Sequence, residues 1–173
     1  GVAELVVTAT RAPIRLDKVG SSISVLTLSD IQRSQANGAT ELLSTTPGVS
    51  FSRNGGQGKT TSIYIRGAES DQTVVLIDGV KLNDPSSTGG GYNAANLLVG
   101  NIARIEVLRG AQSTLWGSQA IGGVINTITK APTKPFEGDL SGEGGSYKTA
   151  YVRGGLGGVT QNLLWRASAS YFT

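Results

Sequence analysis

Glycine divides this chain into short pieces, and that constrains the fold more than any other feature of the sequence. The 173 residues include 25 glycines, about twice the average share, so few segments run far without a turn. Charged residues make up 16% of the chain, below the ~25% that is usual in soluble domains. This composition predicts many turns and short strands, and no large helical core.

Between the glycines, apolar and polar residues alternate with the period of a β-strand. The clearest turn is Asp78-Gly79, which ends an apolar run and starts a return at Val80, as in a hairpin. Ser29 has the character of a helix N-cap, and Pro47-Gly48 ends a second short helix. The pattern predicts a small mixed α/β domain with strands at 21–28, 49–51, 62–66, 73–77, 102–108 and 124–129, helices at 30–34 and 39–45, and one helical turn at 113–116.

The pattern changes after Pro132 and Pro135. One face of the last segment carries Leu163, Trp165, Ala167, Ala169 and Tyr171. Weaker versions of this alternation occur at 139–141 and 151–153. Three such segments match the strands of a transmembrane β-barrel, and the aromatic residues near the ends of the last one weakly favour a membrane interface. The strands of a soluble meander would show the same alternation.

The residue types that are missing exclude several classes of function. The chain has no Cys and no His, so it has no Cys-His metal site, disulfide, thiol nucleophile or Ser-His-Asp triad. Its carboxylates are scattered, and its net charge of +3 is spread along the chain, which does not favour nucleic-acid binding. No run approaches the ~18 apolar residues of a membrane-spanning helix. We therefore expect no enzyme, no catalytic residue, no metal site and no cofactor.

A glycine-rich loop around Lys59 resembles a phosphate-binding loop at first sight. That motif requires a glycine where this chain has Arg53, and a helix after the loop. The residues after Thr61 alternate as a strand does. We therefore expect no nucleotide binding.

The order of short motifs along the chain is more specific than any one of them. The motifs are Val6-Val7-Thr8-Ala9, Pro47-Gly48-Val49, Ile65-Arg66-Gly67, Val75-Leu76-Ile77-Asp78-Gly79-Val80, Ile105-Glu106-Val107-Leu108-Arg109-Gly110 and Trp116-Gly117-Ser118-Gln119-Ala120-Ile121-Gly122-Gly123-Val124-Ile125-Asn126. This series resembles the plug domain of TonB-dependent outer-membrane transporters, most nearly the members of the family that carry cobalamin. The resemblance spans essentially the whole chain.

The resemblance implies an α+β plug domain, a small mixed β-sheet with short helices, followed by the opening antiparallel strands of a transmembrane β-barrel. Residues 1–13 would be the TonB box and linker, 14–135 the plug, and 136–173 the first strands of a barrel of ~22 strands. Three strands cannot close a barrel or leave open edges in lipid, so we expect a piece of a larger protein. It would lie in the outer membrane of a Gram-negative bacterium, with the TonB box facing the periplasm.

The resemblance also implies three groups of site residues. A TonB box would add as an exposed, extended strand to the periplasmic domain of TonB in the TonB-ExbB-ExbD complex; its residues are Glu4, Leu5, Val6, Val7, Thr8 and Ala9. Two apex loops would contact the ligand through Arg53, Asn54, Gly56, Gln57, Lys59, Thr60, Thr61, Asp84, Ser86, Ser87, Thr88, Gly90, Tyr92 and Asn93. A plug–barrel latch would use Arg66, Glu106 and Arg109, with barrel glutamates as partners and with Glu106 able to pair locally with an arginine. An ordinary N-terminal strand, flexible loop tips and weak surface ion pairs are the structural alternatives.

The implied function is active uptake of a scarce, bulky nutrient across the outer membrane, with a corrinoid such as cobalamin favoured. The second alternative is a ferric siderophore, haem or a glycan carried by the same machinery, because glycine and small polar residues suit all of these ligands. An isolated plug with a non-transport binding role is the third alternative. Only Gly1-Val2-Ala3 precedes the TonB box, which speaks against a preceding signalling domain.

Overall fold

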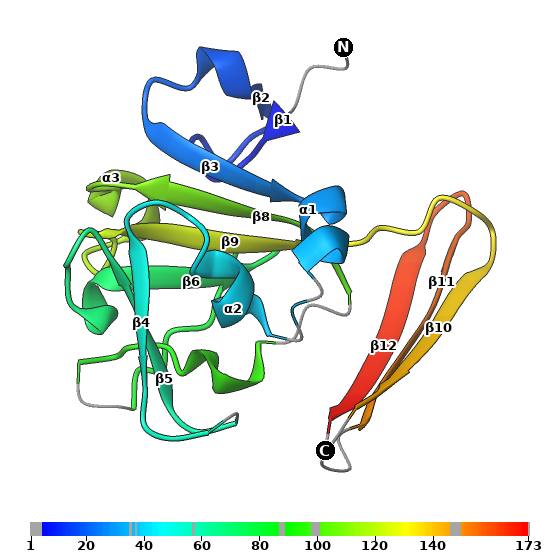
Figure 1. Ribbon diagram of the computed structural model, residues 1–173. Helices are drawn as coiled ribbons and strands as arrows, with labels where there is room; N and C mark the ends of the chain where they lie inside the picture. The colour runs from blue at the N-terminus through cyan, green and yellow to red at the C-terminus, as the bar shows by residue number, and fades with distance from the viewer. Residues whose placement is uncertain are drawn as a thin grey trace.

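The computed structural model describes residues 5–34, 36, 38–56, 58–86, 89–97, 101–145 and 150–172. They form a five-stranded sheet with covering elements on both faces, and a separate three-stranded sheet that stands beside it (Figure 1). No helix among the described residues is long and apolar enough to cross a membrane. The mixed sheet with few short helices confirms the predicted fold class.

The five-stranded sheet has the order β3-β8-β9-β6-β7. Its strands are β3 (Ser22–Thr27), β8 (Ile102–Arg109), β9 (Gly123–Thr129), β6 (Thr73–Ile77) and β7 (Val80–Lys81). Strands β6 and β9 are parallel, and the other neighbours are antiparallel. The predicted hairpin at Asp78-Gly79 is confirmed: Ile77 pairs with Val80, and the two turn residues have φ of 48° and 82°, the left-handed conformation that a tight two-residue hairpin turn needs.

One face of this sheet, here called the helical face, carries the larger apolar core. It is covered by α1 (Leu28–Ser34), α2 (Ala39–Leu43), the hairpin of β4 (Val49–Arg53) and β5 (Thr61–Ile65), and the 3-10 turn η3 (Ala94–Asn96). Buried residues of these elements, such as Leu42, Leu43 and Ile65, pack against Ile105 and Ile125 of the sheet. Another 3-10 turn, η2 (Ser70–Gln72), leads into β6.

The start of α1 differs from the sequence prediction. The helix begins at Leu28, so the predicted N-cap at Ser29 is wrong. Instead, the Thr27 N–H and hydroxyl both donate to Asp30 Oδ2, at 2.9 and 2.6 Å. A carboxylate in the first turn can meet donors that the helix leaves unpaired, so the cap residue is Thr27, two positions before Ser29.

The opposite face, here called the N-terminal face, is covered by the start of the chain. Strand β1 (Leu5–Val6) pairs with β2 (Ile14–Arg15), followed by the 3-10 turn η1 (Leu16–Lys18), and α3 (Ser113–Trp116) lies on the same side. Ala9, Ile23 and Trp116 pack against the second apolar cluster, which consists of Val74, Leu76, Leu108, Ala120 and Val124. The five-stranded sheet is therefore a middle layer between the helices and the N-terminal segment.

The three-stranded sheet is antiparallel, with β11 in the middle. Its strands are β10 (Glu137–Gly144), β11 (Ala150–Val159) and β12 (Leu164–Phe172). Their side chains alternate as predicted: Arg166, Ser168 and Ser170 line a cavity that Ile77 of β6 also borders, while Leu140 and Leu156 line an exposed apolar surface. Leu140 is 82% exposed, so this sheet leaves one apolar face uncovered.

Candidate functional site

The N-terminal segment is docked on the sheet through one buried carboxylate. Glu106 Oε2 accepts hydrogen bonds from the Val7 N–H at 2.9 Å, the Thr8 N–H at 2.8 Å and the Thr8 hydroxyl at 2.6 Å. Glu106 Oε1 accepts one from Arg104 Nε at 2.8 Å. The Glu106 side chain has no exposed surface. A buried charge is tolerated only when it is well paired, so the segment and Arg104 together satisfy this carboxylate.

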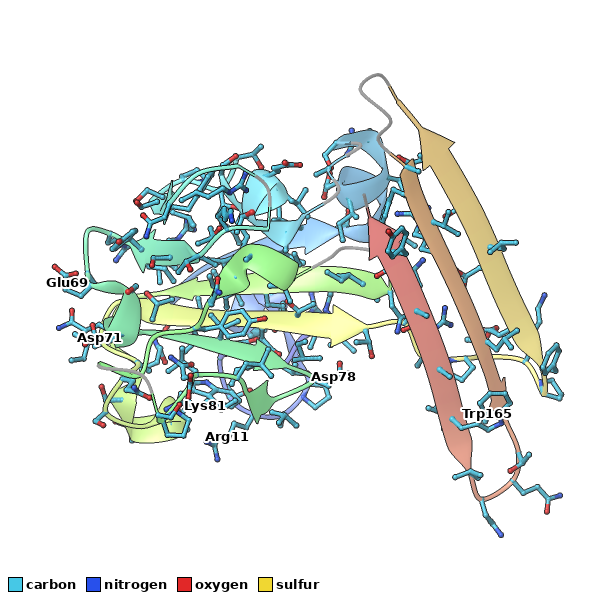
Figure 2. The ribbon with its side chains drawn as sticks, turned by 90° about the horizontal axis from the view of Figure 1, so that it is seen from below. Arg11, Glu69, Asp71, Asp78, Lys81 and Trp165 are labelled. Carbon is cyan, nitrogen blue, oxygen red and sulfur yellow. The ribbon has the colours of Figure 1, made fainter. Side chains whose placement is uncertain are left out.

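Trp116 also holds the segment, through a hydrogen bond and a ring contact. Its indole N–H donates to the Thr8 carbonyl at 2.9 Å, and the Arg11 guanidinium lies over its ring, 4.4 Å from the centroid. Beside them is a cavity of about 480 Å³, lined also by Asp78 and Asn126 (Arg11 and Asp78 are labelled in Figure 2). Residues 7–11 are therefore fixed by both main-chain and side-chain contacts.

This docking corrects the expectation that the TonB box is exposed. Leu5 is half exposed, but Val6 and Thr8 are fully buried, because the main-chain donors of Val7 and Thr8 find a carboxylate on β8. Glu4 lies outside the described residues. The assignment of residues 4–9 as a TonB-binding segment stays a prediction.

The two predicted ligand loops meet in the structure. Asn93 Oδ1 accepts from the Thr61 N–H at 3.0 Å and from the Ala95 N–H at 3.1 Å. Asn83 holds the second loop to the sheet, donating to the Thr73 and Gly90 carbonyls and accepting from the Val75 N–H. The loop of the β4–β5 hairpin and strand β1 lie on opposite sides of the plug (Figure 1). Thr61 and Asn93 thus join the two loops, on the side of the sheet away from the N-terminal segment.

Within this region, some predicted ligand residues serve the fold instead. Arg53 Nη2 donates back to the Thr40 hydroxyl at 3.3 Å, and Thr61 is buried. Tyr92 packs against the core of the helical face, and burial raises the pKa of its phenol. These three side chains therefore contact the protein itself.

Other predicted ligand residues lie where a ligand can reach them. Asn54, Gly56, Lys59 and Thr60 are exposed at the hairpin tip. Asp84 is exposed as well, and its Oδ1 accepts from the Ser86 N–H and hydroxyl. Gln57, Ser87 and Thr88 lie outside the described residues.

The two glycines singled out in the loops differ in their surroundings. A Cβ at Gly56 would have no atom within 4 Å. At Gly90 φ is +73°, and a Cβ would lie 2.5 Å from Gln119 Nε2, which also donates to the Gly90 carbonyl. Only Gly56 is therefore free to accept a side chain.

The two predicted latch arginines lie side by side. A Cβ at Gly48 would be 3.6 Å from Arg66 Cγ and 3.7 Å from Arg109 Cδ. Arg109 donates to the Pro47 carbonyl at 2.6 Å and to the Ser24 hydroxyl at 2.8 Å. Neither arginine forms a salt bridge with a carboxylate of the described residues. The aliphatic parts of both side chains thus flank Gly48, and guanidinium groups are well suited to bind carboxylates.

Glu106 does not belong to this pair. Residues 106 and 109 are an odd number of positions apart on β8, so their side chains lie on opposite faces of the sheet. The arginine that pairs with Glu106 is Arg104, two residues away on the same face. Glu106 thus pairs locally with an arginine, as expected, but with Arg104 and on the face opposite Arg109. The assignment of Arg66 and Arg109 to a plug–barrel latch stays a prediction.

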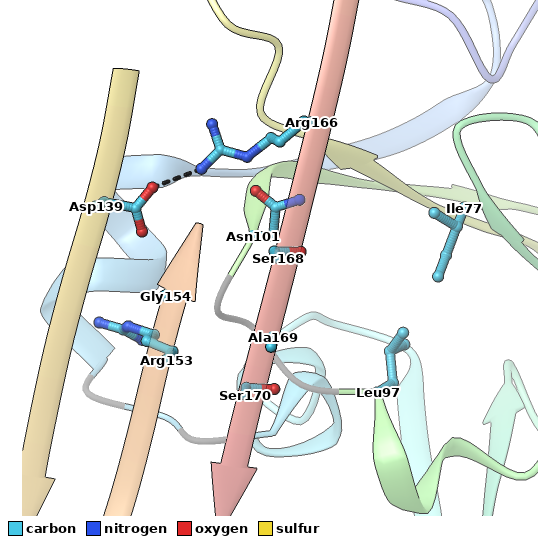
Figure 3. Close-up of a pocket in the computed structure, with 10 residues that line it drawn as sticks. All are labelled: Ile77, Leu97, Asn101, Asp139, Arg153, Gly154, Arg166, Ser168, Ala169 and Ser170. Carbon is cyan, nitrogen blue, oxygen red and sulfur yellow. Dashed lines mark hydrogen bonds and ion pairs between the residues drawn. The ribbon is translucent and has the colours of Figure 1, made fainter. Parts of the chain in front are cut away.

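The three-stranded sheet carries a second charged site that the sequence analysis did not single out. Arg166 contacts Glu137 at 3.4 Å and Asp139 at 2.6 Å, and its side chain is only 10% exposed. It borders a cavity of about 230 Å³ that Ile77 and Leu97 of the plug also line (Figure 3). The sequence offered one signal for this site: Arg166 is the charged residue of the segment that forms β12, and it lies on the polar face of that segment.

Comparison of the sequence with known protein families shows to which family the chain belongs. Residues 15–124 match the TonB-dependent receptor plug domain. The chain belongs to this family.

Named relatives extend the comparison. The chain is 40% identical over 127 residues to the vitamin B12 transporter BtuB of Vibrio cholerae, and 41% identical over 125 residues to that of Vibrio vulnificus. These matches cover 73% and 72% of this chain and 20% of each relative. The chain thus spans about a fifth of the length of the curated relatives it matches.

Solved structures with this fold include receptors for other ligands. The ferripyoverdine receptor of Pseudomonas aeruginosa, bound to ferripyoverdine, superposes with a TM-score of 0.80 at 26% identity, over 98% of this chain and 22% of that one. The alcaligin receptor FauA of Bordetella pertussis gives a TM-score of 0.78 at 22% identity, over 98% of this chain and 29% of that one. The second match shows the fold alone.

Proposed function

We propose that the protein is a TonB-dependent transporter that carries a corrinoid, most simply cobalamin, across the outer membrane, with the plug gating the barrel. The main observation that supports this proposal is the position of two regions: two exposed loops are joined at Asn93 on one side of the sheet, while the N-terminal segment is docked on the other. A ligand bound on one side and a partner acting on the other need such an arrangement. The identity to vitamin B12 transporters over most of the chain supports the corrinoid.

The loops give the proposed ligand site its character. The exposed residues of the hairpin tip present small polar side chains and unhindered glycine amides, which let a bulky ligand approach the backbone closely. Asn93 and Asn83 hold the loops in place from behind. The remaining wall of the site comes from barrel loops in this proposal.

The N-terminal segment is the proposed contact with TonB. Residues 4–9 form a short, β-prone segment in front of a linker that contains Pro13. Once released from Glu106, this segment is suited to add as a strand to the edge of a partner's sheet. The TonB-ExbB-ExbD complex would act from the periplasm. The transporter would reside in the outer membrane of a Gram-negative bacterium.

Residues 136–173 are the proposed first strands of the barrel. The uncovered apolar face around Leu140 and Leu156 then faces lipid, and the face with Arg166 faces the plug. Arg66 and Arg109 are the proposed latch, and barrel carboxylates supply the ion-pair partners that neither arginine has among the described residues.

A ferric siderophore is the second candidate ligand. The observation in its favour is that a receptor bound to ferripyoverdine superposes on nearly the whole chain. The loop residues do not discriminate between these ligand classes, because no charged cluster lies at the hairpin tip.

Titration of the full-length protein in detergent separates the candidates. We expect saturable binding of cobalamin, and no saturable binding of ferripyoverdine or ferric enterobactin. Saturable siderophore binding without cobalamin binding would move the assignment to iron uptake. Absence of both would contradict the proposed ligand site.

A further inference from the structure

Glu106 lies in the interior, yet most of its contacts are with a segment almost a hundred residues away. Three donors converge on Oε2, and all three belong to Val7 and Thr8. The other oxygen pairs with Arg104, whose side chain is 27% exposed. If the segment left the sheet, Oε2 would lose every one of these partners. Since an unpaired buried carboxylate is strongly unfavourable, Glu106 favours the docked segment.

The docked geometry conflicts with strand addition. In a β-ladder, neighbouring N–H groups along a strand point to opposite edges. Here the consecutive N–H groups of Val7 and Thr8 both point at one carboxylate, and the Thr8 carbonyl accepts from Trp116. Residues 7 and 8 therefore cannot hold this geometry and extend a partner's sheet at the same time.

We propose that Glu106 is a positioning residue that holds the N-terminal segment in an autoinhibited, docked form and thereby sets the fraction of molecules available to TonB. This rests on the proposed function, because it takes TonB as the partner of residues 4–9. Glu106 acts from inside the plug and needs no barrel residue. It makes no contact with Arg66 or Arg109, so its effect is separable from the latch.

The test uses the full-length protein with a single cysteine at Leu5 that carries a spin label. Leu5 is half exposed and donates none of the three hydrogen bonds to Glu106 Oε2. These 173 residues contain no other cysteine; any elsewhere is replaced by serine. Label mobility is compared in the parent, Glu106→Gln, Thr8→Val and Thr8→Ser.

The variants change single hydrogen-bonding groups. Glu106→Gln keeps the shape of the side chain but replaces one carboxylate oxygen by an NH2 donor, which must face either Arg104 or the segment. Thr8→Val removes one donor and leaves Glu106 and β8 intact, and Thr8→Ser restores it.

We expect the mobile fraction to rise in Glu106→Gln and Thr8→Val and to stay at the parent value in Thr8→Ser. TonB affinity is then measured for the parent and Glu106→Gln only, because residue 106 lies outside the segment. A rise in the released fraction from about a tenth to about a half tightens the apparent Kd about fivefold.

A label equally immobile in all four proteins overturns the proposal. Release of the segment in Glu106→Gln without a gain in TonB affinity also overturns the proposal, because release of the segment would then not limit TonB binding. If TonB binds neither the parent nor Glu106→Gln, the proposed function fails, and label mobility still decides whether Glu106 holds the segment.

Discussion

At the scale of single residues, two charged positions of one strand have different roles. Glu106 and Arg109 are three residues apart on one strand, yet one holds the N-terminal segment and the other borders the proposed latch. Their separation on opposite faces follows from the strand period and was predictable. Their partners were not, because the hydrogen bonds of Glu106 to Val7 and Thr8 span 99 and 98 residues.

The two loop glycines give a prediction at this scale. Gly56→Val adds a side chain in open space, so it leaves stability unchanged and weakens corrinoid binding by the order of tenfold, equal to about 1.4 kcal/mol, by blocking close approach. Gly90→Val places a β-branched residue at positive φ against Gln119, so it destabilises the loop by about 1–3 kcal/mol. Ligand titration together with thermal unfolding separates these effects.

Lys59→Ala is the matched control for that pair, because it lies in the same loop and removes a charge without adding bulk. We expect it to weaken binding less than Gly56→Val. A larger loss in Lys59→Ala would mean that charge, and not backbone approach, dominates recognition.

At the scale of elements, local patterns predicted most of the fold. Alternation, apolar runs and the glycines that bound them located β3, β6, β8 and β9 within one or two residues, and Asp78-Gly79 fixed the β6–β7 hairpin. These signals are contained in a few neighbouring residues. The join between the two loops was missed, since the Asn93–Thr61 bond spans 32 residues. The helix start at Leu28 was missed because Asp30 contacts Thr27 from inside the first turn.

Helix α1 gives a pH-dependent prediction. Hydrogen bonds from the Thr27 hydroxyl and N–H, with a further contribution from Arg33, lower the pKa of Asp30 below its ordinary value of 3.8. A carboxylate with a lowered folded-state pKa contributes stability above its unfolded pKa and loses it as pH falls through the folded pKa. Asp30→Asn should therefore speed amide exchange in residues 28–34 at neutral pH, and this difference should vanish well below pH 3.8.

Glu41→Gln is the control for that measurement, because Glu41 is exposed in α2 and forms no ion pair with the described residues. We expect exchange in α1 to be the same as in the parent. An Asp30→Asn effect that persists in acid would show that packing, and not ionisation, accounts for it.

The N-terminal segment gives the second prediction for an element. Val7→Pro removes the N–H that donates to Glu106 and that a TonB-paired strand would use, and it fixes φ. Energised uptake should be lost while cobalamin affinity stays within about twofold, a difference of about 0.4 kcal/mol. Val7→Ala keeps the donor and should retain uptake. Normal uptake by Val7→Pro would contradict main-chain pairing with TonB.

At the scale of the whole molecule, one sheet lies between two distant regions. The loops at Asn93 lie on one side, and the segment held by Glu106 lies on the other (Figure 1). The three-stranded sheet stands beside them with an uncovered apolar face. The family resemblance found in the sequence is confirmed by the match of residues 15–124 to the plug domain, whereas the ligand depends on loops whose small polar residues suit several ligand classes.

Uptake of radiolabelled cobalamin by cells tests the central claim most directly. The full-length protein is expressed in a Gram-negative host that lacks its own cobalamin transporter, with and without functional TonB. The account predicts saturable uptake in the cells with TonB and uptake at background level in the cells without it. Background uptake in both, from cells whose surface protein is folded, or equal uptake in both, would contradict it.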